Sequence, residues 1–221
     1  MIKLDNVTKI FGRGKDSLTA LDHVSMNVEE GSYLGLSGRS GSGKTTLLNV
    51  ISGLERATAG NINVDGINVQ SATDGRLAAF RNKTIGFVFQ SFHLNDWETA
   101  LENTVLPLLL TRTSRSEREK LAADVLNRLG LSDKIDSRVG TLSTGQCQRV
   151  ALARALVTKP KILLADEPTA NIDSEAENEA LNIIDELHAG GMTIVLVSHD
   201  PKVLERVPRT ITIEKGRIVK Y

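Results

Sequence analysis

The residues most able to do chemistry in this chain lie in a glycine-rich stretch, GRSGSGKT, at positions 38–45. The stretch fits the pattern G-x-x-x-x-G-K-[ST], in which a flexible loop turns several backbone N–H groups toward a phosphate. Lys44 would then reach the β- and γ-phosphate oxygens, and the Thr45 hydroxyl would bind Mg²⁺. An ordinary glycine-rich turn is the alternative. The expected strand before the stretch and helix after it favour a site for a nucleoside triphosphate.

Two acidic residues, Asp166 and Glu167, directly follow the apolar run ILLA. They would therefore lie at the carboxyl end of a buried strand, where open α/β sheets bind their ligands. We expect Asp166 to hold Mg²⁺ through water and Glu167 to polarise an attacking water as a general base. Acids at a strand end can also serve only as caps or turn formers. The phosphate loop makes the catalytic interpretation the stronger one.

Three further residues are of interest only through their positions. Gln90 ends the strand IGFVFQ, and His199 follows the strand TIVLVS, so both would face the γ-phosphate from strand ends. Phe11 follows the first expected strand and could stack on a base. Each of these residues could instead have a purely structural role. Gln90 and His199 could form buried hydrogen bonds, and Phe11 could pack in the core.

A second candidate anion site is the stretch LSTGQCQRVALARAL at 142–156, which is typical of a polar turn opening into a helix. The free N–H groups and the dipole of a helix N-terminus both favour an anion. Within this turn we expect Thr144 to adopt an ordinary negative φ and Gly145 to retain the freedom for a positive one.

The elements that must position these residues can be read from the periodicity of the sequence. We expect strands at 2–7, 20–28, 33–38, 84–90, 161–166 and 193–198, a hairpin turning at Asp65-Gly66, and a helix at 44–54 with Leu54 on its apolar side. Another helix should begin with a capping box formed by Ser174 and Glu177. The segment from 91 to 158 is expected to be helical. Strands that alternate with helices predict an α/β fold with a parallel sheet and an inserted helical segment.

Composition excludes several classes of protein. The 221 residues carry 27 Lys and Arg against 27 Asp and Glu, so no basic footprint for nucleic acid is expected. The single cysteine, Cys147, cannot form an intrachain disulfide and fits a reducing cytoplasm. No apolar run approaches the roughly 20 residues that span a bilayer. We therefore expect a cytoplasmic protein whose membrane role, if any, depends on a partner.

With GRSGSGKT, LSTGQ, LADEPTANID and VSHD in this order, the chain resembles the ATP-binding cassette (ABC) ATPases over nearly its whole length. The resemblance implies a P-loop NTPase (RecA-like) core with a mainly parallel sheet, an N-terminal antiparallel β subdomain and an inserted α-helical subdomain. It implies one ATPase domain over 1–221, with the core and β subdomain in 1–90 and 159–221 and the helical subdomain in 91–158. It also implies a head-to-tail homodimer that sandwiches two MgATP molecules, each bound by one copy and capped by the signature sequence LSGGQ of the other.

The resemblance assigns a role to each motif. Gln90 matches the Q-loop, Asp173 the D-loop, His199 the switch histidine and Phe11 the aromatic that stacks on adenine. The residues implied in binding ATP are Phe11, Gly38, Arg39, Ser40, Gly41, Ser42, Gly43, Lys44, Thr45, Thr46, Gln90, Ser143, Gly145, Gln146 and Asp173. Those implied in binding Mg²⁺ are Thr45, Gln90 and Asp166, and those implied in catalysis are Lys44, Gln90, Glu167 and His199.

A narrower resemblance is to the lipoprotein-release and macrolide- or peptide-export branch of the family (LolD- and MacB-like), carried by IGFVFQSFHL, TALENTVLPLLL and LADEPTANID. It implies an ATPase subunit on the inner face of the cell membrane that powers a permease with a large extracytoplasmic domain. An FtsE-like role, transmitting force without a transported substrate, is one alternative, and a soluble ABC ATPase outside transport is another. The chain departs from the family pattern at Thr144 in the signature and at Asn95-Asp96-Trp97, a segment expected to face the permease.

Overall fold

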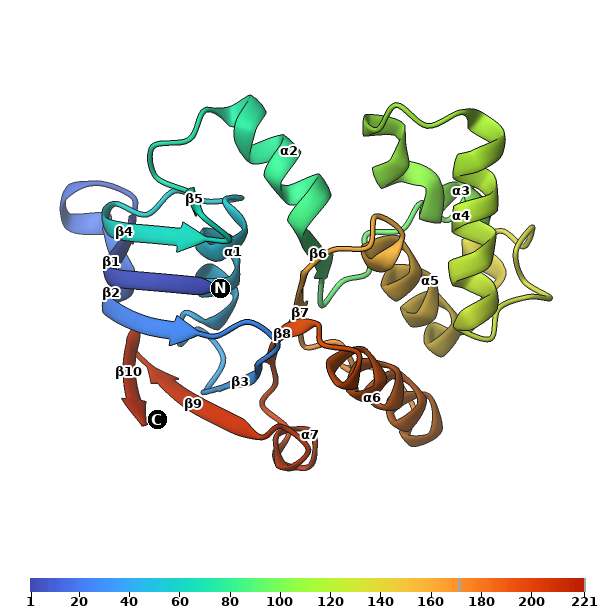
Figure 1. Ribbon diagram of the computed structural model, residues 1–221. Helices are drawn as coiled ribbons and strands as arrows, with labels where there is room; N and C mark the ends of the chain where they lie inside the picture. Colours follow the sequence, from blue (N-terminus) through green and yellow to red (C-terminus); the bar gives the residue numbers. More distant parts are fainter. Residues whose placement is uncertain (171, 221) are drawn as a thin grey trace.

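The computed structural model describes residues 1–170 and 172–220, and its elements follow one another as an α/β chain (Figure 1). The strands are β1 Ile2–Phe11, β2 Leu18–Val28, β3 Tyr33–Ser37, β4 Ala59–Val64, β5 Ile67–Asn68, β6 Ile85–Val88, β7 Ile162–Asp166, β8 Thr193–Val197, β9 Arg209–Glu214 and β10 Arg217–Lys220. The α-helices are α1 Lys44–Ser52, α2 Asp74–Thr84, α3 Ala100–Val105, α4 Arg115–Arg128, α5 Thr144–Leu156, α6 Ser174–Ala189 and α7 Pro201–Glu205. Short 3₁₀ helices are η1 Gly14–Asp16, η2 Leu106–Leu110 and η3 Val139–Thr141.

The strands form two sheets of different kinds. One is antiparallel, in the order β2-β1-β4-β5, and its β4–β5 hairpin turns at Asp65-Gly66 as expected, with φ of 48° and 79°. The other has the order β10-β9-β3-β8-β7-β6 and is parallel from β9 to β6, with only β10 antiparallel. The predicted fold class, a mainly parallel sheet with an N-terminal antiparallel β region and a helical insertion, is therefore confirmed.

Helix α1 lies between the two sheets, where it contacts β2 and β4 on one side and β7 and β8 on the other (Figure 1). Its apolar side chains are fully buried in one core that includes residues of both sheets. Because side chains alternate along a strand, Leu164 of β7 and Val195 of β8 face this core, while their neighbours Leu163 and Leu196 face the opposite side.

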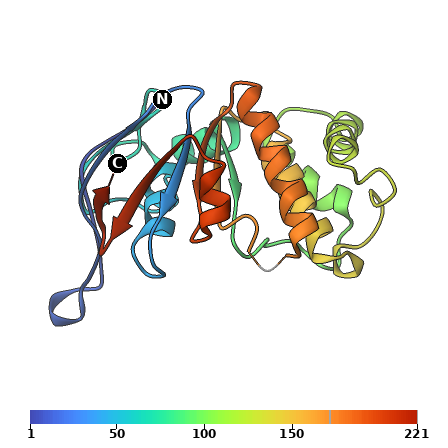
Figure 2. The same ribbon diagram turned by 90° about the horizontal axis from the view of Figure 1, so that it is seen from below.

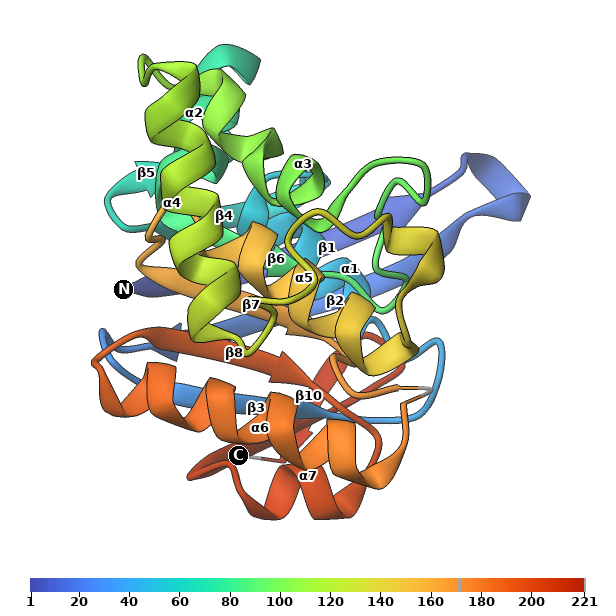
Figure 3. The ribbon, with the colours of Figure 1, turned by 90° about the vertical axis from the view of Figure 1, so that its right-hand side faces the viewer.

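The opposite face of the parallel sheet is covered by α5, α6 and α7, which enclose a second core (Figure 3). The helices α3 and α4 pack on α5, with Leu108, Ala122 and Val157 in a small apolar cluster of their own. Within residues 1–170 and 172–220, no helix combines the length and the apolar character needed to cross a membrane.

Local expectations differ from the structure at two helix ends. Helix α1 stops at Ser52, with Gly53 as a left-handed C-cap at φ 67°, so Leu54 lies outside the helix and is exposed. The N-cap of α6 is Asp173, whose carboxylate accepts from the N–H groups of Glu175 and Ala176, and not Ser174. An aspartate and a serine are equally good caps, and only the chain direction at the end of the preceding loop selects between them.

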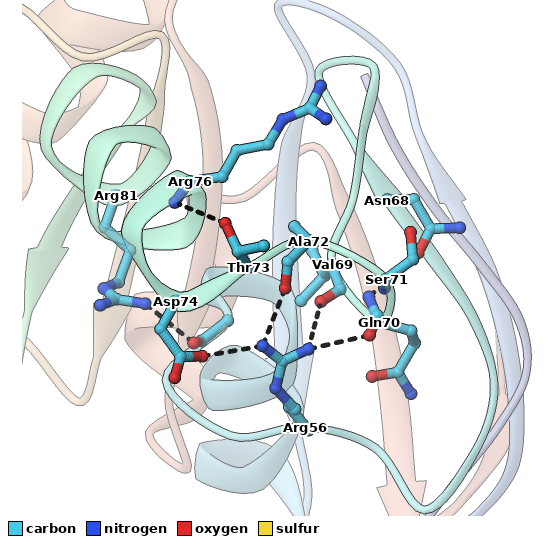
Figure 4. A network of polar contacts seen from close by, with 11 residues as sticks. Arg56, Asn68, Val69, Gln70, Ser71, Ala72, Thr73, Asp74, Arg76 and Arg81 are labelled. Carbon is cyan, nitrogen blue, oxygen red and sulfur yellow. Dashed lines mark hydrogen bonds and ion pairs between the residues drawn. The ribbon is translucent and has the colours of Figure 1, made fainter.

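A network around Arg56 fixes the connection from the β4–β5 hairpin to α2 (Figure 4). The Arg56 guanidinium donates to the carbonyls of Gln70 and Ala72 at 2.8 Å each, and to Asp74 Oδ1 at 2.8 Å. Arg56 thereby ties the loop after β5 to the first residue of α2. The helix itself begins with Thr73, whose hydroxyl accepts from the Arg76 N–H.

We expect Arg56→Ala to destabilise the protein by about 1–2 kcal/mol, because three carbonyl and carboxylate acceptors lose a charged donor. Urea unfolding followed by circular dichroism would measure the loss. Arg76→Ala is the matched control, since the Arg76 guanidinium points away from the network in Figure 4. Equal stability of the two variants would contradict a structural role for Arg56.

Candidate nucleotide-binding site

One cavity of about 940 Å³ gathers residues from widely separated parts of the chain. Its size is that of a pocket for a ligand as large as a nucleotide. The predicted site residues that line it are Phe11, Gly38, Arg39, Ser40, Gly41, Ser42, Gly43, Lys44, Thr45, Thr46, Gln90, Asp166, Glu167 and His199. Residues that the motifs did not predict also line it: Leu18, Thr19, Ala20, Ser37, Val197, Glu214, Lys215 and Gly216.

The glycine loop turns between the end of β3 and the start of α1, and two of its glycines, Gly38 and Gly43, are required by space as well as by φ. Gly38 has φ 146°, and a Cβ there would lie 2.3 Å from the carbonyl oxygen of Ile213. Gly43 is the N-cap of α1 at φ 107°, and a Cβ there would lie 2.4 Å from the carbonyl oxygen of Ala20. The loop is therefore held against the backbones of β2 and β9, where no side chain fits.

The polar groups of this loop fit a bound phosphate. Ser42 Oγ is buried and has no hydrogen-bond partner among the described residues, which leaves it available to a ligand. Lys44 is also buried, and its Nζ donates to the carbonyls of Gly38 and Arg39 at 2.7 and 3.0 Å. The N-terminus of α1 faces the same space, so its free N–H groups and dipole add to the attraction for an anion.

Asp166 and Thr45 together offer the hard oxygen donors that suit Mg²⁺. Asp166 ends β7 and is only 4% exposed. Burial raises the pKa of its carboxyl above the usual value and Glu167 adds to the rise, whereas a hydrogen bond from Thr45 and the charge of Lys44 act against it. A divalent cation would reverse the effect of burial, because it favours the ionised carboxylate.

Glu167 and His199 form a pair at the carboxyl ends of β7 and β8. His199 Nδ1 lies 2.8 Å from Glu167 Oε1, and the Glu167 side chain is largely buried while the His199 ring is 70% exposed. The backbone of Glu167 has φ 47°, a left-handed conformation that is rare for a residue other than glycine. Its N–H donates to the Val197 carbonyl, which holds this conformation and keeps the side chain at the cavity.

Phe11 lies at the rim of the cavity, at the end of β1. Its side chain is partly exposed, and Lys9 Nζ stands 4.6 Å from the centre of its ring. An exposed ring at the mouth of a nucleotide-sized cavity can stack on a base. The structure thus does not bury Phe11 in the core, which was the alternative interpretation.

The signature residues Ser143, Gly145 and Gln146, together with Asp173, do not line this cavity. Ser143 and Gln146 form a reciprocal capping box at the start of α5: Gln146 N–H donates to Ser143 Oγ at 3.3 Å, and Ser143 N–H donates to Gln146 Oε1 at 3.0 Å. Asp173 caps α6 through its carboxylate alone, which accepts from the N–H groups of Glu175 and Ala176. The structure therefore divides the predicted site residues into two groups that do not meet within one copy of the chain.

Thr144 is the first helical residue of α5 and, as predicted, avoids the left-handed region. We expected Gly145 to be needed for a positive φ, and this is wrong, because Gly145 lies within the helix and its φ is not positive. Its requirement is spatial: a Cβ at Gly145 would lie 2.6 Å from Ala176 Cβ. The first turns of α5 and α6 are packed too closely there for a side chain.

Most cavity residues that the motifs missed come from β2 and from the end of β9 with its turn into β10, and Ser37 and Val197 come from the ends of β3 and β8. Ala20 and Gly216 approach one another so closely that a Cβ at Gly216 would lie 2.8 Å from the Ala20 carbonyl oxygen. The sequence Glu214-Lys215-Gly216 signals a turn between two strands. The sequence pattern of this turn does not predict that the turn packs beside the phosphate loop.

Comparison with known proteins places this geometry in a family. The sequence model of the family described as "ABC transporter" matches residues 21–170. The chain is 42% identical over 219 residues to the ABC transporter ATP-binding protein YvrO of Bacillus subtilis, covering 99% of this chain and 96% of YvrO. It is 43% identical to the macrolide export ATP-binding/permease protein MacB of Hyphomonas neptunium, of which it covers only 34%.

The fold is also similar to a solved structure of the ATP-binding cassette MJ0796. That structure is a dimer in a post-hydrolysis state, bound to ADP and Pi. It matches with a TM-score of 0.93 and 39% sequence identity, covering 100% of this chain and 97% of the other. At this level of sequence identity, the two proteins are similar as members of one family and not only in their fold.

We expect Gly145→Ala to force α5 away from α6 and to destabilise the protein by about 1–3 kcal/mol. Urea unfolding would measure this loss. Because Gly145 does not line the cavity, the folded variant should still bind a fluorescent ATP analogue. The control is Thr144→Ala at the adjacent exposed position, which should change stability by less than about 0.5 kcal/mol.

Proposed function

Because this chain belongs to the ABC transporter family, as one of its ATP-binding and ATP-hydrolysing subunits, we propose that it powers a membrane permease through ATP-driven closure of a homodimer. One observation carries the proposal. The cavity joins a phosphate loop to the Glu167–His199 pair, whereas the signature residues lie outside it and have no nucleotide to contact within their own copy.

The residues of the cavity divide the work of binding and hydrolysis. The phosphate loop from Gly38 to Thr46 binds the phosphates, with Lys44 neutralising their charge and Phe11 stacking on the base. Glu167 accepts the proton of the attacking water through its carboxylate. His199 orients that carboxylate by the contact from Nδ1, and Gln90 lies across the cavity where it can orient the water.

Mg²⁺ is part of this proposal. Thr45 and Asp166, joined by Gln90 from the loop that follows β6, would hold the ion, directly or through water. When bound, the ion supplies positive charge to the phosphate oxygens as the phosphoryl group is transferred. The oxygen donors of these three side chains suit that ion better than a softer metal.

The complete site needs a second copy of the chain. In a head-to-tail dimer, Ser143, Gly145 and Gln146 of one copy would cap the nucleotide bound by the other, with Asp173 beside them. The exposed capping box of α5 supports this role, since it presents a helix N-terminus to an outside anion. The dimeric state of the MJ0796 cassette with ADP and Pi is consistent with the same arrangement.

A groove on a different face suits the permease. Its cavity of about 280 Å³ lies among α2, β6, η2 and the end of α5, and is lined by Ala78, Arg81, Asn82, Ile85, Phe87, Pro107, Leu110, Arg154, Ala155 and Thr158. Exposed Leu106, Leu109 and Leu110 form an apolar border along η2. An exposed apolar border of this kind marks an interaction site. The groove joins the sheet to the helical segment, so movement of one against the other would reach the permease.

Three finer features complete the proposal. The unit 91–158 would act as a helical subdomain that rotates against the rest of the chain. The protein would lie on the inner face of the cell membrane, held there by its permease. The likeness to MacB supports an export or release system whose permease carries a large extracytoplasmic domain.

We expect Glu167→Gln to lower ATP hydrolysis at least 100-fold, because the amide cannot accept the proton, and to trap an ATP-bound dimer. Colorimetric phosphate release and size-exclusion chromatography with MgATP would measure the two effects. Lys44→Ala is the matched variant, which should lose hydrolysis without trapping a dimer. Hydrolysis by Glu167→Gln near the wild-type rate would contradict the assignment of the base.

We expect Leu110→Glu to reduce the fraction of protein that sediments with membranes by at least fivefold, because a charge would enter the apolar border of the groove. Leu54→Glu, also at an exposed leucine, is the control. Affinity purification of the wild type from membranes would identify the permease that binds it. The binding of Leu110→Glu to that permease can then be compared with the binding of the wild type. If Leu110→Glu still associates fully with membranes, the groove is not the surface that contacts the permease.

A further inference from the structure

Trp97 has no role in the site or the groove, although it is the chain's only tryptophan. Its side chain is 81% exposed, more than that of any other large apolar residue recorded among the described residues. It lines neither the nucleotide cavity nor the groove. Tryptophan is the residue that contributes most often to the energetic centre of protein interfaces.

The turn that carries Trp97 is held rigidly. Asn103, which is buried, donates to the Asn95 carbonyl at 3.0 Å and accepts from the Asn95 N–H at 2.8 Å. The Trp97 N–H then donates to Asn95 Oδ1 at 3.2 Å. A capping box between Thr99 and Glu102 fixes the next turn. These bonds fix the backbone that carries Trp97, so little backbone entropy would be lost when a partner buries the side chain.

The same turn is joined to the segment that leads into the signature helix. The Val139 N–H donates to the Glu98 carbonyl, and the Gly140 N–H donates to the Asp96 carbonyl, each at 3.0 Å. Ser143 begins α5 three residues later. Trp97 therefore belongs to the signature end of α5. The groove lies at the opposite end, with Ala155 and Thr158, and the 13-residue helix separates the two by about 18 Å.

We propose that Trp97 packs, in the closed homodimer, against the apolar rim of the partner's nucleotide cavity, formed by Phe11 and Leu18. This inference rests on the proposed head-to-tail dimer, in which the signature end of each copy meets the nucleotide cavity of the other. The two rim residues line that cavity and are themselves exposed, Leu18 by 65% and Phe11 by 37%. The β1–β2 connection and the first turn of α5 lie along one edge of the molecule, the lower edge in Figure 2 and the right-hand edge in Figure 3.

The charges on the two surfaces are complementary. Trp97 stands between Asp96 and Glu98, both exposed, whereas the cavity carries the exposed Arg39, and the exposed Arg13 follows Phe11 by two residues. Opposite charges at the border of an apolar contact favour that pairing over others. The proposed partner of Trp97 is therefore a second copy of this chain, in place of the permease that the family resemblance suggested for the segment 95–97.

The emission of the single tryptophan tests this directly. In the full-length Glu167→Gln variant, addition of MgATP should form the dimer, seen by size-exclusion chromatography, and shift the Trp97 emission to shorter wavelength as the indole leaves water. The shift should depend on protein concentration in step with the dimer. If no dimer forms, the proposed function fails. If the dimer forms while the emission stays that of an exposed indole, the proposed role of Trp97 is wrong and the function stands.

Truncation of the side chain gives a second test in the same background. Trp97→Ala should raise the dimer Kd at least tenfold, while the monomer keeps its affinity for a fluorescent ATP analogue. Leu54→Ala, at an exposed leucine far from the phosphate end of α1, is the matched control and should change the Kd less than twofold. Combining Trp97→Ala with Leu18→Ala should raise the Kd by less than the product of the two single effects. An unchanged Kd in Trp97→Ala, or independent effects in the double variant, would overturn the proposal.

Discussion

The close approach of three backbones around the phosphate loop is the constraint on which the rest of the structure depends. Gly38 touches the backbone of β9 and Gly43 touches that of β2, at distances that exclude any Cβ. The loop is thus held between the parallel sheet and the antiparallel sheet, with α1 buried between them. Because its carbonyls and N–H groups cannot rearrange freely, the binding site is preorganised before a ligand arrives.

A second consequence of this arrangement concerns charge. The ends of β7 and β8 bring Asp166 and Glu167 to the phosphate loop, where burial disfavours an ionised Asp166. The left-handed backbone of Glu167 is a strained conformation of the kind that collects at functional sites. It is retained because β8 supplies the carbonyl that binds its N–H. A bound cation would offset the cost of burying the ionised Asp166.

The separation of the two helix N-termini is the physical basis of the proposal that this chain works in pairs. The start of α1 serves the chain's own cavity, whereas the start of α5 is satisfied by its own capping box and presents its outer surface to another molecule. Gly145 allows α5 to lie close to α6, so the signature and Asp173 form one continuous surface. We regard Trp97 as an extension of that surface, since its turn is hydrogen-bonded to the residues that precede α5.

The sequence by itself determined the fold class, the β4–β5 hairpin and the chemistry of the phosphate loop, because each depends on local rules: strand alternation, turn residues with positive φ, and glycine spacing. Helix α2 and strands β9 and β10 were not predicted; α2 has 11 residues, but only Leu77, Phe80 and Thr84 are buried, so its apolar pattern is weak. Tertiary structure alone decided that β2 and the β9–β10 turn line the cavity, that Gly145 is needed for packing and not for φ, and that Trp97 lies beside the signature. The reason is that such contacts join residues far apart in the chain, and their distances depend on how the sheets and helices pack.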